Sequence, residues 1–509
     1  RNIGTMQNNV SKILIFILTI ILLIVIDPFN SGLLSNDNNK KQNFKNVNTV
    51  IELIKSHYVD SVNDQKLNEK IINSILNELD PHSTYISKEN MQTVNEDMQG
   101  SFSGIGIQFN IIQDSVVVIA AISGGPSEKL GIVSGDRIVE VNGETIAGID
   151  IKNEDVINKL RGKAKSVVNI KIYRRGSLDL ISFSIIRDDI PLYSVDCSIM
   201  LNKDIGYIKI NRFSATTYNE FISGSEKLLK LGMNQLILDL RGNPGGYLEM
   251  AIKVADEILK KDNLIVYTEG RNRTKNEFYS TNGGILENTP LVILIDEGSA
   301  SASEIVSGAI QDNNRGLIIG KRSFGKGLVQ EQISLSDGSV VRLTTQRYFT
   351  PSGRCIQKSY KKDSINDNII SKTKKVHKIL DEGGILPDIE VKTDSTLNYS
   401  EINLIISKGW INEFTLNYSL LLKKTNQNLS EDKFINSINE DQFLKSFLIF
   451  LEEKNYKFQL NPKDKEVEIL KNILKANIGR NIWSEEVYYK IICSKDDFIN
   501  TAKKSHEIN

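Results

Sequence analysis

The hydrophobic pattern changes character several times along the 509-residue chain. In residues 47–98 apolar side chains recur mostly three and four apart, the period of amphipathic helices, and Pro81 stops this helical stretch. Residues 100–187 show short β-branched runs between glycine turns, which predict strands. In residues 188–392 apolar runs alternate with helical patterns, and residues 393–509 are mostly helical in pattern. The chain therefore predicts several units of different texture.

Individual elements follow from these patterns. In residues 100–187 we expect strands at 105–109, 115–119, 137–141, 167–173 and 180–186, and helices at 127–130 and 153–160. In residues 188–392 we expect strands at 235–240, 290–295, 316–320, 328–335 and 340–349, and helices at 247–259 and 302–311. Asp337-Gly338 is a hairpin turn signal between the last two strands.

Length and composition exclude some classes of protein. A chain of 509 residues predicts three or four folded units, and 40% hydrophobic with 25% charged residues is typical of globular proteins. Lys plus Arg and Asp plus Glu both total 63, so no net charge attracts nucleic acid. Cys197, Cys355 and Cys493 are too scattered for a disulfide framework or a zinc site, and we expect structural thiols. The absence of HExxH and GxSxG motifs argues against zinc peptidases and hydrolases with a nucleophile elbow.

An apolar run lies near the N-terminus, at residues 13–26. It follows Lys12 and is typical of an export signal or an N-terminal anchor. No small-x-small cleavage pattern precedes Asp27-Pro28, which favours an anchor, although the run is shorter than the roughly 17 to 25 residues of a usual span. A buried helix is the alternative, and the Asn-rich tract 35–48 argues against it. We expect residues 1–34 to be a signal or membrane anchor.

Three alternating serines precede or begin the helix predicted at 302–311. Ser299, Ser301 and Ser303 follow a buried strand, so one hydroxyl lies at a sharp turn beside free helix N–H groups. Such a turn suits a nucleophile, because the next N–H lies at the positive end of the helix dipole and can stabilise an oxyanion. Serine is also a favoured helix cap, so the pattern alone leaves both roles open.

A lysine between two glycines precedes the strand predicted at 328–335. Glycines on both sides of Lys326 allow the backbone to approach another segment closely and to bury the ammonium group. A lysine that acts as a general base must be largely neutral near pH 7. Burial would therefore have to lower its pKa from about 10.4 by roughly three units.

Two glycine-containing segments occur in order in residues 99–187. They are Ser103-Gly104-Ile105-Gly106-Ile107 and the sequence GDRIVEVNG at 135–143. Backbone N–H groups freed of side-chain bulk can converge on a carboxylate, and a peptide C-terminus can then add as a strand to a sheet edge. The segments resemble a PDZ domain, which implies that residues 103–107 bind a substrate C-terminus. A simple glycine turn entering a strand is the alternative.

Further motifs occur in order between residues 47 and 391. They are LDPHS at 79–83, DLRGNPGG at 239–246, SASASEI at 299–305, FGKG at 324–327, YFTPSGR at 348–354 and GILPD at 384–388. Together with the PDZ-like segment they resemble the C-terminal processing, or tail-specific, serine peptidases. The resemblance implies a multidomain α/β and α+β protein, with a crotonase-like α/β peptidase core, an inserted PDZ domain, an N-terminal helical segment and a C-terminal helical extension.

The resemblance also implies individual roles. It selects Ser301 as the nucleophile, Lys326, 25 residues later, as the general base, and Gln330 as the residue that orients the lysine. It places one oxyanion donor at the N–H of Ala302 and the other at Gly245-Gly246, with Gly246 as the donor. No metal or organic cofactor is implied. The dyad must lie within about 2.6 to 3.2 Å when productive, although resting enzymes can be looser.

The implied domains are an anchor at 1–34, a helical segment at 47–98, a PDZ domain at 99–187, a peptidase core at 188–392 and a helical extension at 393–509. We expect cleavage of proteins near apolar free C-termini, in the bacterial cell envelope on the periplasmic side, with the enzyme exported or anchored in the inner membrane. His82 in the 79–83 turn is expected to be structural. The extension is assigned a structural or partner-binding role, which leaves a homo-oligomer or an adaptor open.

Two other functions are compatible with parts of the same pattern. The first is a catalytically inactive PDZ scaffold of the cell envelope, and the complete set of nucleophile, base and oxyanion residues argues against it. The second is an acyl-CoA enzyme on the same core, in whose chemistry a Ser-Lys pair has no place.

Overall fold

The computed structural model describes residues 45–122, 124–359, 383–392, 399–426, 428–459 and 465–508. Contacts divide the chain into two units, Arg1–Ile75 and Leu76–Asn509. The apolar run predicted at 13–26 lies outside the described residues. Within the described ranges, no helix is both long and apolar enough to cross a membrane.

Helices form the described part of the first unit, as the pattern predicts. They are α3 (Lys45–His57) and most of α4 (Asp64–Asn77). The second unit begins with the end of α4, then strand β1 (Thr84–Ile86) and α5 (Lys88–Gln99). The helical pattern does not predict β1, a three-residue strand.

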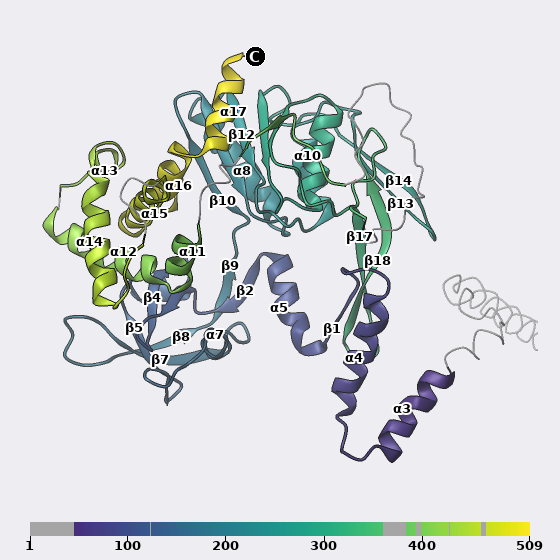
Figure 1. Ribbon diagram of the computed structural model, residues 1–509, viewed down its shortest axis with the longest axis horizontal. Coiled ribbons are helices and arrows are strands. Elements are labelled where there is room, and N and C mark those ends of the chain that lie inside the picture. Colours follow the sequence, from purple (N-terminus) through teal and green to yellow (C-terminus); the bar gives the residue numbers. More distant parts are fainter. Residues whose placement is uncertain are drawn as a thin grey trace, which may run out of the picture. The chain divides into compact units, whose positions relative to one another are not determined.

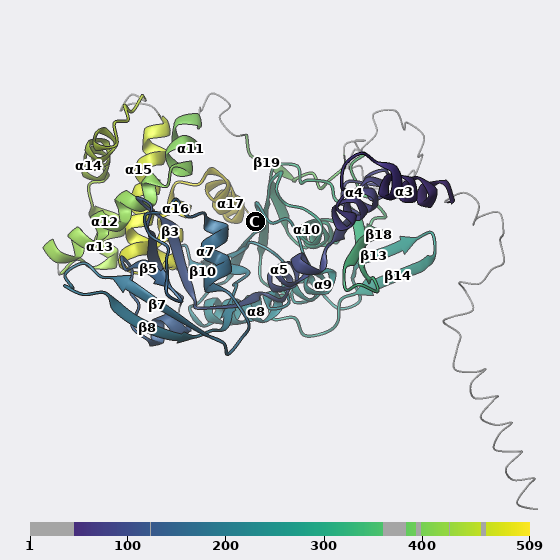
Figure 2. The same ribbon diagram turned by 90° about the horizontal axis from the view of Figure 1, so that it is seen from below.

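A mostly parallel sheet forms the centre of residues 188–392, the predicted peptidase core. Its strand order is β10 (Val195–Met200), β11 (Ile205–Ile210), β12 (Gln235–Asp239), β15 (Leu291–Ile295), β16 (Leu317–Gly320) and β19 (Ile389–Glu390), and only β10 is antiparallel to its neighbour. The chain alternates these strands with α8 (Thr217–Lys230), α9 (Leu248–Asp256) and α10 (Ala302–Asp312) (Figure 1 and Figure 2). The loops after β12 and β15 therefore meet at the carboxyl edge of the sheet, where α/β folds bind ligands.

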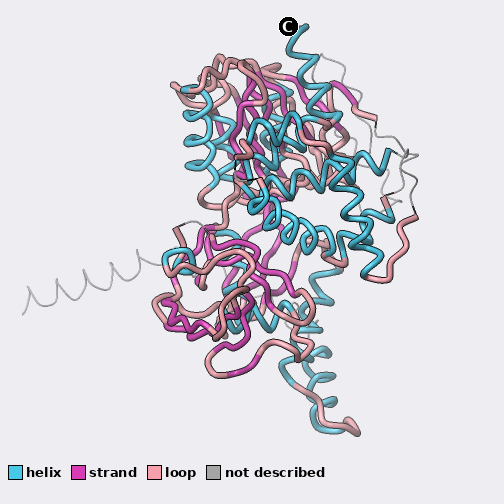
Figure 3. Tube along the Cα trace, turned by 90° about the vertical axis from the view of Figure 1, so that its left-hand side faces the viewer, coloured by secondary structure: helices cyan, strands magenta, loops and turns pink. Residues whose placement is uncertain are grey.

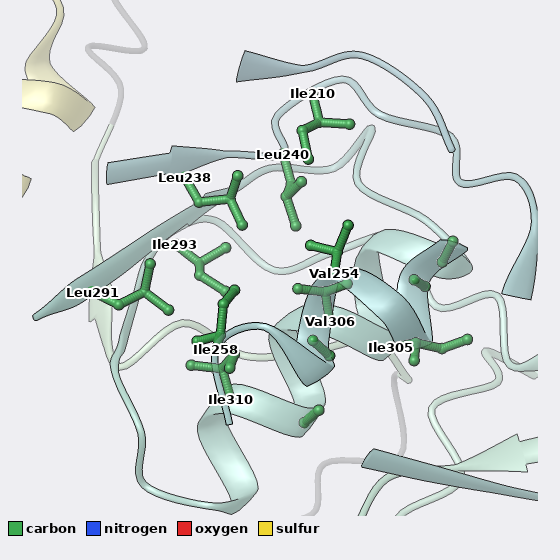
Figure 4. Packing of buried hydrophobic residues seen from close by; sticks show 14 of the residues in the cluster. Ile210, Leu238, Leu240, Val254, Ile258, Leu291, Ile293, Ile305, Val306 and Ile310 are labelled. Carbon is green, nitrogen blue, oxygen red and sulfur yellow. The ribbon is translucent and has the colours of Figure 1, made fainter. Parts of the chain in front are cut away.

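Each face of this sheet is covered by different helices. On one face Leu238 and Ile293 pack against Val254 of α9 and Val306 of α10, as Figure 4 shows. The opposite face carries a separate cluster built from alternate strand residues and from the last helices of the chain: Tyr207, Ile237, Val292, Leu294, Ile319, Cys493, Ile499 and Ala502. A parallel sheet needs apolar cover on both faces, and the C-terminal extension supplies part of it.

A second sheet contributes to the same core. It contains β1, β13 (Leu264–Gly270), β14 (Arg273–Tyr279), β17 (Leu328–Ser334) and β18 (Val340–Phe349). The long strand β18 pairs with both β1 and β17, and the predicted hairpin of β17 and β18 is confirmed. Strand β1 thereby lies close to the residues that follow Lys326.

The PDZ-like segment forms a sheet of its own. Its order is β3 (Ile107–Ile111), β4 (Val116–Ala121), β5 (Arg137–Val141), β7 (Val167–Tyr173) and β8 (Ile181–Ile186), and β6 (Glu144–Thr145) pairs with β5. Two helices accompany it, α6 (Pro126–Lys129) and α7 (Asn153–Leu160), while β2 (Ser101–Gly104) pairs with β9 (Asp188–Pro191). Strand β3 is an edge strand, so one of its sides is open to pairing.

The C-terminal extension is helical, as predicted. It contains α11 (Ser400–Ser407), α12 (Trp410–Thr425), α13 (Glu431–Ser437), α14 (Glu440–Glu453), α15 (Lys465–Ile482), α16 (Glu485–Ser494) and α17 (Asp497–Ile508). Figure 3 shows the helices as cyan tubes and the strands in magenta. Helices α11 to α16 enclose two apolar clusters rich in aromatic rings.

Candidate active site

Ser301 lies in a sharp turn between β15 and α10. Its backbone has φ 55° and ψ −111°, a region that a non-glycine residue occupies at a cost of about 1 to 3 kcal/mol. The hydroxyls of Ser299 and Ser303 are fully buried and donate to the carbonyls of Leu240 (2.8 Å) and Asn243 (3.0 Å). Ser301 alone of the three serines is partly exposed. We call residues 296–301 the nucleophile turn.

The loop after β12, residues 241–246, packs directly against the nucleophile turn. The N–H of Ala300 donates to the carbonyl of Asn243 at 2.9 Å. A Cβ atom added to Gly245 would lie 2.8 Å from the Cβ of Ser301 and 2.9 Å from the nitrogen of Ala302. Only glycine fits at this contact. We call residues 241–246 the oxyanion loop, because they contain the predicted oxyanion donor Gly246.

Two backbone N–H groups beside Ser301 are available to a ligand. Among the hydrogen bonds of the described residues, none uses the N–H of Ala302 or of Gly246. The N–H of Gly245, by contrast, donates to Oδ1 of Asn243 at 2.9 Å. Of the two glycines proposed from the sequence, Gly246 therefore has the available donor, and Gly245 provides the close approach.

Lys326 lies in a loop before β17, residues 321–327, which we call the base loop. Its Nζ donates to Oε1 of Gln330 at 3.1 Å, and Nε2 of Gln330 donates to the carbonyl of His82 at 2.5 Å. Burial lowers the pKa of Lys326, and the positive charge of Arg342 lowers it further. The hydrogen bonds of the described residues do not include one between Lys326 Nζ and Ser301 Oγ, so the two side chains are not joined in this state.

The turn at residues 79–83 provides the backbone carbonyl, that of His82, to which the Gln330 amide donates. Oδ1 of Asp80 accepts the N–H groups of His82 and Ser83, both at 2.8 Å, and Oδ2 accepts the Ser83 hydroxyl at 2.8 Å. These bonds fix the His82 carbonyl that holds the Gln330 amide. Burial lowers the pKa of His82 and so favours the neutral imidazole.

A buried carboxylate that the sequence did not single out joins the nucleophile turn to the base loop. Glu304 has no exposed surface. Its Oε2 accepts the N–H groups of Ser301 (2.8 Å) and Lys326 (2.9 Å), and its Oε1 accepts the N–H of Gly325 (2.7 Å) and the hydroxyl of Ser323 (2.5 Å). Burial raises the pKa of Glu304, while these four donors act in the opposite direction. One side chain thus holds the backbone of both proposed catalytic residues.

Tyr348 makes a second connection between the same two segments. Its hydroxyl donates towards the carbonyl of Ser301 at 3.0 Å and also contacts the carbonyl of Lys326. Tyr348 is almost fully buried, and burial raises its pKa well above the usual value, so it stays a neutral donor.

A groove lies beside the edge strand of the PDZ-like sheet. Its volume is about 410 Å³, and its lining includes Ile105, Gly106 and Ile107 from the predicted loop and Ile157 and Leu160 from α7. Ser103 and Gly104, which were also predicted, are not among the lining residues. The groove is mainly apolar and adjoins an unpaired strand edge, which suits an extended peptide.

Comparison with known proteins agrees with this architecture. Residues 204–370 match the model of peptidase family S41 and residues 117–174 that of a PDZ domain. A carboxy-terminal-processing protease of Bartonella bacilliformis is 36% identical over 328 residues, which cover 64% of this chain and 74% of that protein. The chain belongs to the family of carboxy-terminal processing proteases. It is thus a serine peptidase.

Further comparisons concern the same carboxy-terminal processing proteases and the regions on either side of the peptidase match. The protease CtpB of Bacillus subtilis is 34% identical over 325 residues, or 63% of this chain and 67% of its own. Residues 30–90 match the model of the activating protease CtpB N-terminal domain, and residues 402–484 match a family of unknown function. Among solved structures, the photosystem II D1 C-terminal processing protease aligns with 69% of this chain and 88% of its own, at 26% identity and a TM-score of 0.38.

Proposed function

We propose that this protease cleaves protein substrates near their C-termini through an acyl-enzyme, with Ser301 as nucleophile and Lys326 as general base. Neutral Lys326 takes the hydroxyl proton of Ser301 while Oγ attacks the scissile carbonyl carbon. The protonated lysine then gives this proton to the leaving amine as the peptide bond breaks. Water then attacks the ester carbonyl carbon while Lys326 takes one of its protons. Lys326 returns this proton to Ser301 Oγ as the ester C–O bond breaks, which releases the carboxylic acid product and regenerates the serine and the neutral lysine. The hydrogen bond between Nζ and Oγ forms when substrate is bound.

The observation that supports this most is the pair of ties between the nucleophile turn and the base loop. Glu304 and Tyr348 contact backbone atoms of both segments, so they hold the two loops together without using the Ser301 hydroxyl or the Lys326 amine. The N–H groups of Ala302 and Gly246 are the proposed donors to the oxyanion of each tetrahedral intermediate. Gln330, a neutral acceptor, holds Nζ without stabilising its charge as a carboxylate would.

We propose that the PDZ groove binds the free C-terminus of the substrate. The peptide would extend the sheet along β3, its apolar side chains would enter the groove, and its carboxylate would meet backbone N–H groups of the 103–107 loop. The inactive scaffold is the competing reading of the same domain order, and no observation favours it.

The test uses the full chain and a peptide that ends in apolar residues. We expect cleavage by the parent and a loss of about 1,000-fold or more in both Ser301→Ala and Lys326→Ala. Lys230→Ala is the control, because this lysine is 79% exposed and pairs with Glu226 of the same helix, α8, at 3.9 Å. Intact peptide with the parent, or equal rates for parent and Ser301→Ala, would rule out the dyad. Cleavage of an amidated peptide as fast as of the free acid would rule out recognition of the substrate's terminal carboxylate by the PDZ groove.

We further propose that residues 13–26 attach the enzyme to a membrane. The support is the apolar run that follows Lys12. Fractionation of cells that express the full chain, and of cells that express it without residues 1–34, tests this. Equal release of both proteins into the soluble fraction would contradict the proposal.

A further inference from the structure

The last two helices of the C-terminal extension form part of the peptidase core itself. Cys493 of α16 and Ile499 and Ala502 of α17 are buried to 1% exposure or less against the second face of the sheet. The hydroxyl of Tyr489 donates to Asp196 at 3.0 Å beside this cluster. Helices α16 and α17 follow the stretch 402–484 that matches a family of unknown function.

Asp496, between α16 and α17, makes two kinds of contact. Its Oδ1 accepts the N–H groups of Phe498 (2.8 Å) and Ile499 (3.2 Å), so it caps α17. Its Oδ2 forms an ion pair with Nη1 of Arg241 at 2.9 Å, and both side chains are only 16% exposed. The capping bonds fix the carboxylate in place, and this makes it a rigid partner for the arginine.

Arg241, the first residue of the oxyanion loop, is held from both sides. Asp239 accepts from Nε and Nη2 of Arg241 at 2.6 to 3.0 Å, and the ring of Phe498 lies 4.7 Å from the guanidinium carbon. Lys209 donates to the Arg241 carbonyl at 2.5 Å. The carboxylates of Asp239 and Asp496 thus balance the charges of Arg241 and Lys209 at the start of the oxyanion loop.

The residues that follow Arg241 hydrogen-bond to the nucleophile turn and to the start of α10. The N–H of Gly242 donates to Asp296 at 2.7 Å, and the carbonyl of Asn243 accepts from Ala300 at 2.9 Å and from the Ser303 hydroxyl at 3.0 Å. Gly246 follows three residues later. A shift of Arg241 would therefore move the oxyanion loop relative to the nucleophile turn.

We propose that Asp496 is a positioning residue for the oxyanion loop, and that the C-terminal extension thereby sets the catalytic rate of the core. The proposal rests on the role proposed above for the Gly246 N–H. Loss of one oxyanion donor costs about 100- to 1,000-fold in kcat, so an indirect displacement of the donor should cost a part of this, on the order of 10-fold. Ground-state binding in the PDZ groove does not involve Arg241, so KM should change little.

The decisive variant is Asp496→Asn, because asparagine keeps the size and the capping oxygen, while it removes the negative charge and replaces the oxygen that accepts from Arg241 by an amide N–H donor. Asp497→Asn is the matched control, since Asp497 is the next residue, is exposed, and lies in the first turn of the same helix. We expect kcat to fall about 10-fold in Asp496→Asn with KM within about twofold, the control to match the parent, and Asp496→Glu to recover part of the rate.

Each outcome decides the question. A drop in melting temperature with unchanged kcat, or an equal loss in Asp497→Asn, would reduce Asp496 to a structural role and overturn the proposal. If Asp496→Asn does not fold, Phe498→Leu takes its place: it keeps apolar packing but removes the ring beside Arg241, and an unchanged kcat would overturn the proposal. Ser301→Ala distinguishes failure of the proposed dyad from failure of the role proposed for Asp496. Equal activity of Ser301→Ala and the parent would refute the dyad. An inactive Ser301→Ala together with a fully active Asp496→Asn would refute only the role of Asp496.

Discussion

Replacing Gln330 by glutamate would place a negative charge at the amine of the proposed base. The amide oxygen of Gln330 now accepts a hydrogen bond from Lys326 Nζ at 3.1 Å. A carboxylate of the same shape would stabilise the ammonium form, and so would raise a pKa that burial at present lowers. The other carboxylate oxygen would face the His82 carbonyl and lose the present 2.5 Å bond.

The size of the effect follows from the distance. Two unit charges 3.1 Å apart interact by about 5 kcal/mol at an effective dielectric constant of about 20, which is an upper bound for this partly exposed site. Opposite charges at such distances raise a lysine pKa by about 1 to 3 units. Below the pKa, each unit lowers the neutral fraction about tenfold, so we expect kcat/KM to fall about 10- to 1,000-fold near pH 7 and to recover as pH rises.

The assay is the pH profile of kcat/KM for a fluorogenic peptide with an apolar free C-terminus. Gln330→Ala removes both hydrogen bonds without adding charge, and should lower the plateau without raising the pKa of the rising limb. Gln113→Glu adds the same charge at an exposed position between β3 and β4 of the PDZ-like sheet and should leave the profile unchanged. A loss in Gln330→Glu by the same factor at every pH would refute the reasoning, because the charge would not have acted on the base. An equal shift in Gln113→Glu would refute it too.

Three further substitutions test the supports of the site. Glu304→Gln leaves at least one of four buried donors unpaired, so we expect a lower melting temperature, a cost of about 1 to 3 kcal/mol, and a reduced kcat; unchanged melting would contradict this. Tyr348→Phe removes the hydroxyl that joins the nucleophile turn to the base loop, and should cost about 0.5 to 1.5 kcal/mol by thermal unfolding with a fall in kcat at unchanged KM. Gly245→Ala should abolish cleavage, because its Cβ would lie 2.8 Å from that of Ser301. Gly232→Ala has a similar φ (94° against 98°) but nothing within 4 Å of its Cβ, and should retain cleavage.

Strands β5, β7 and β18 and helix α7 have the bounds that the pattern predicts. In β7 alternate residues are buried, and in α7 the buried Val156 and Leu160 lie four apart, so both elements show the expected period. Strand β14 was missed because six of its seven residues are exposed, so it shows no alternation of apolar and polar positions.

The site was predictable only in part. Motif resemblance selected Ser301, and the structure adds a physical difference, because the neighbouring serine hydroxyls are bound to backbone carbonyls. Glu304 was missed, although Ser301 and Glu304 form the S-x-x-E pattern of a capping box, which was the available signal. Its remaining partners, Ser323, Gly325 and Lys326, lie 19 to 22 residues away, and no local pattern reveals such contacts.

The charges around Lys326 explain how a carboxylate can support a lysine base without stabilising its protonated form overall. Glu304 and Asp80 both act to raise the pKa of Lys326, yet burial and Arg342 outweigh them and the pKa is lowered. Both carboxylates are occupied by backbone N–H and hydroxyl donors, so neither hydrogen-bonds to Nζ. The group that does contact Nζ is the neutral amide of Gln330. The site therefore uses negative charge to hold the backbone and a neutral group to hold the amine, which is the separation that Gln330→Glu would abolish.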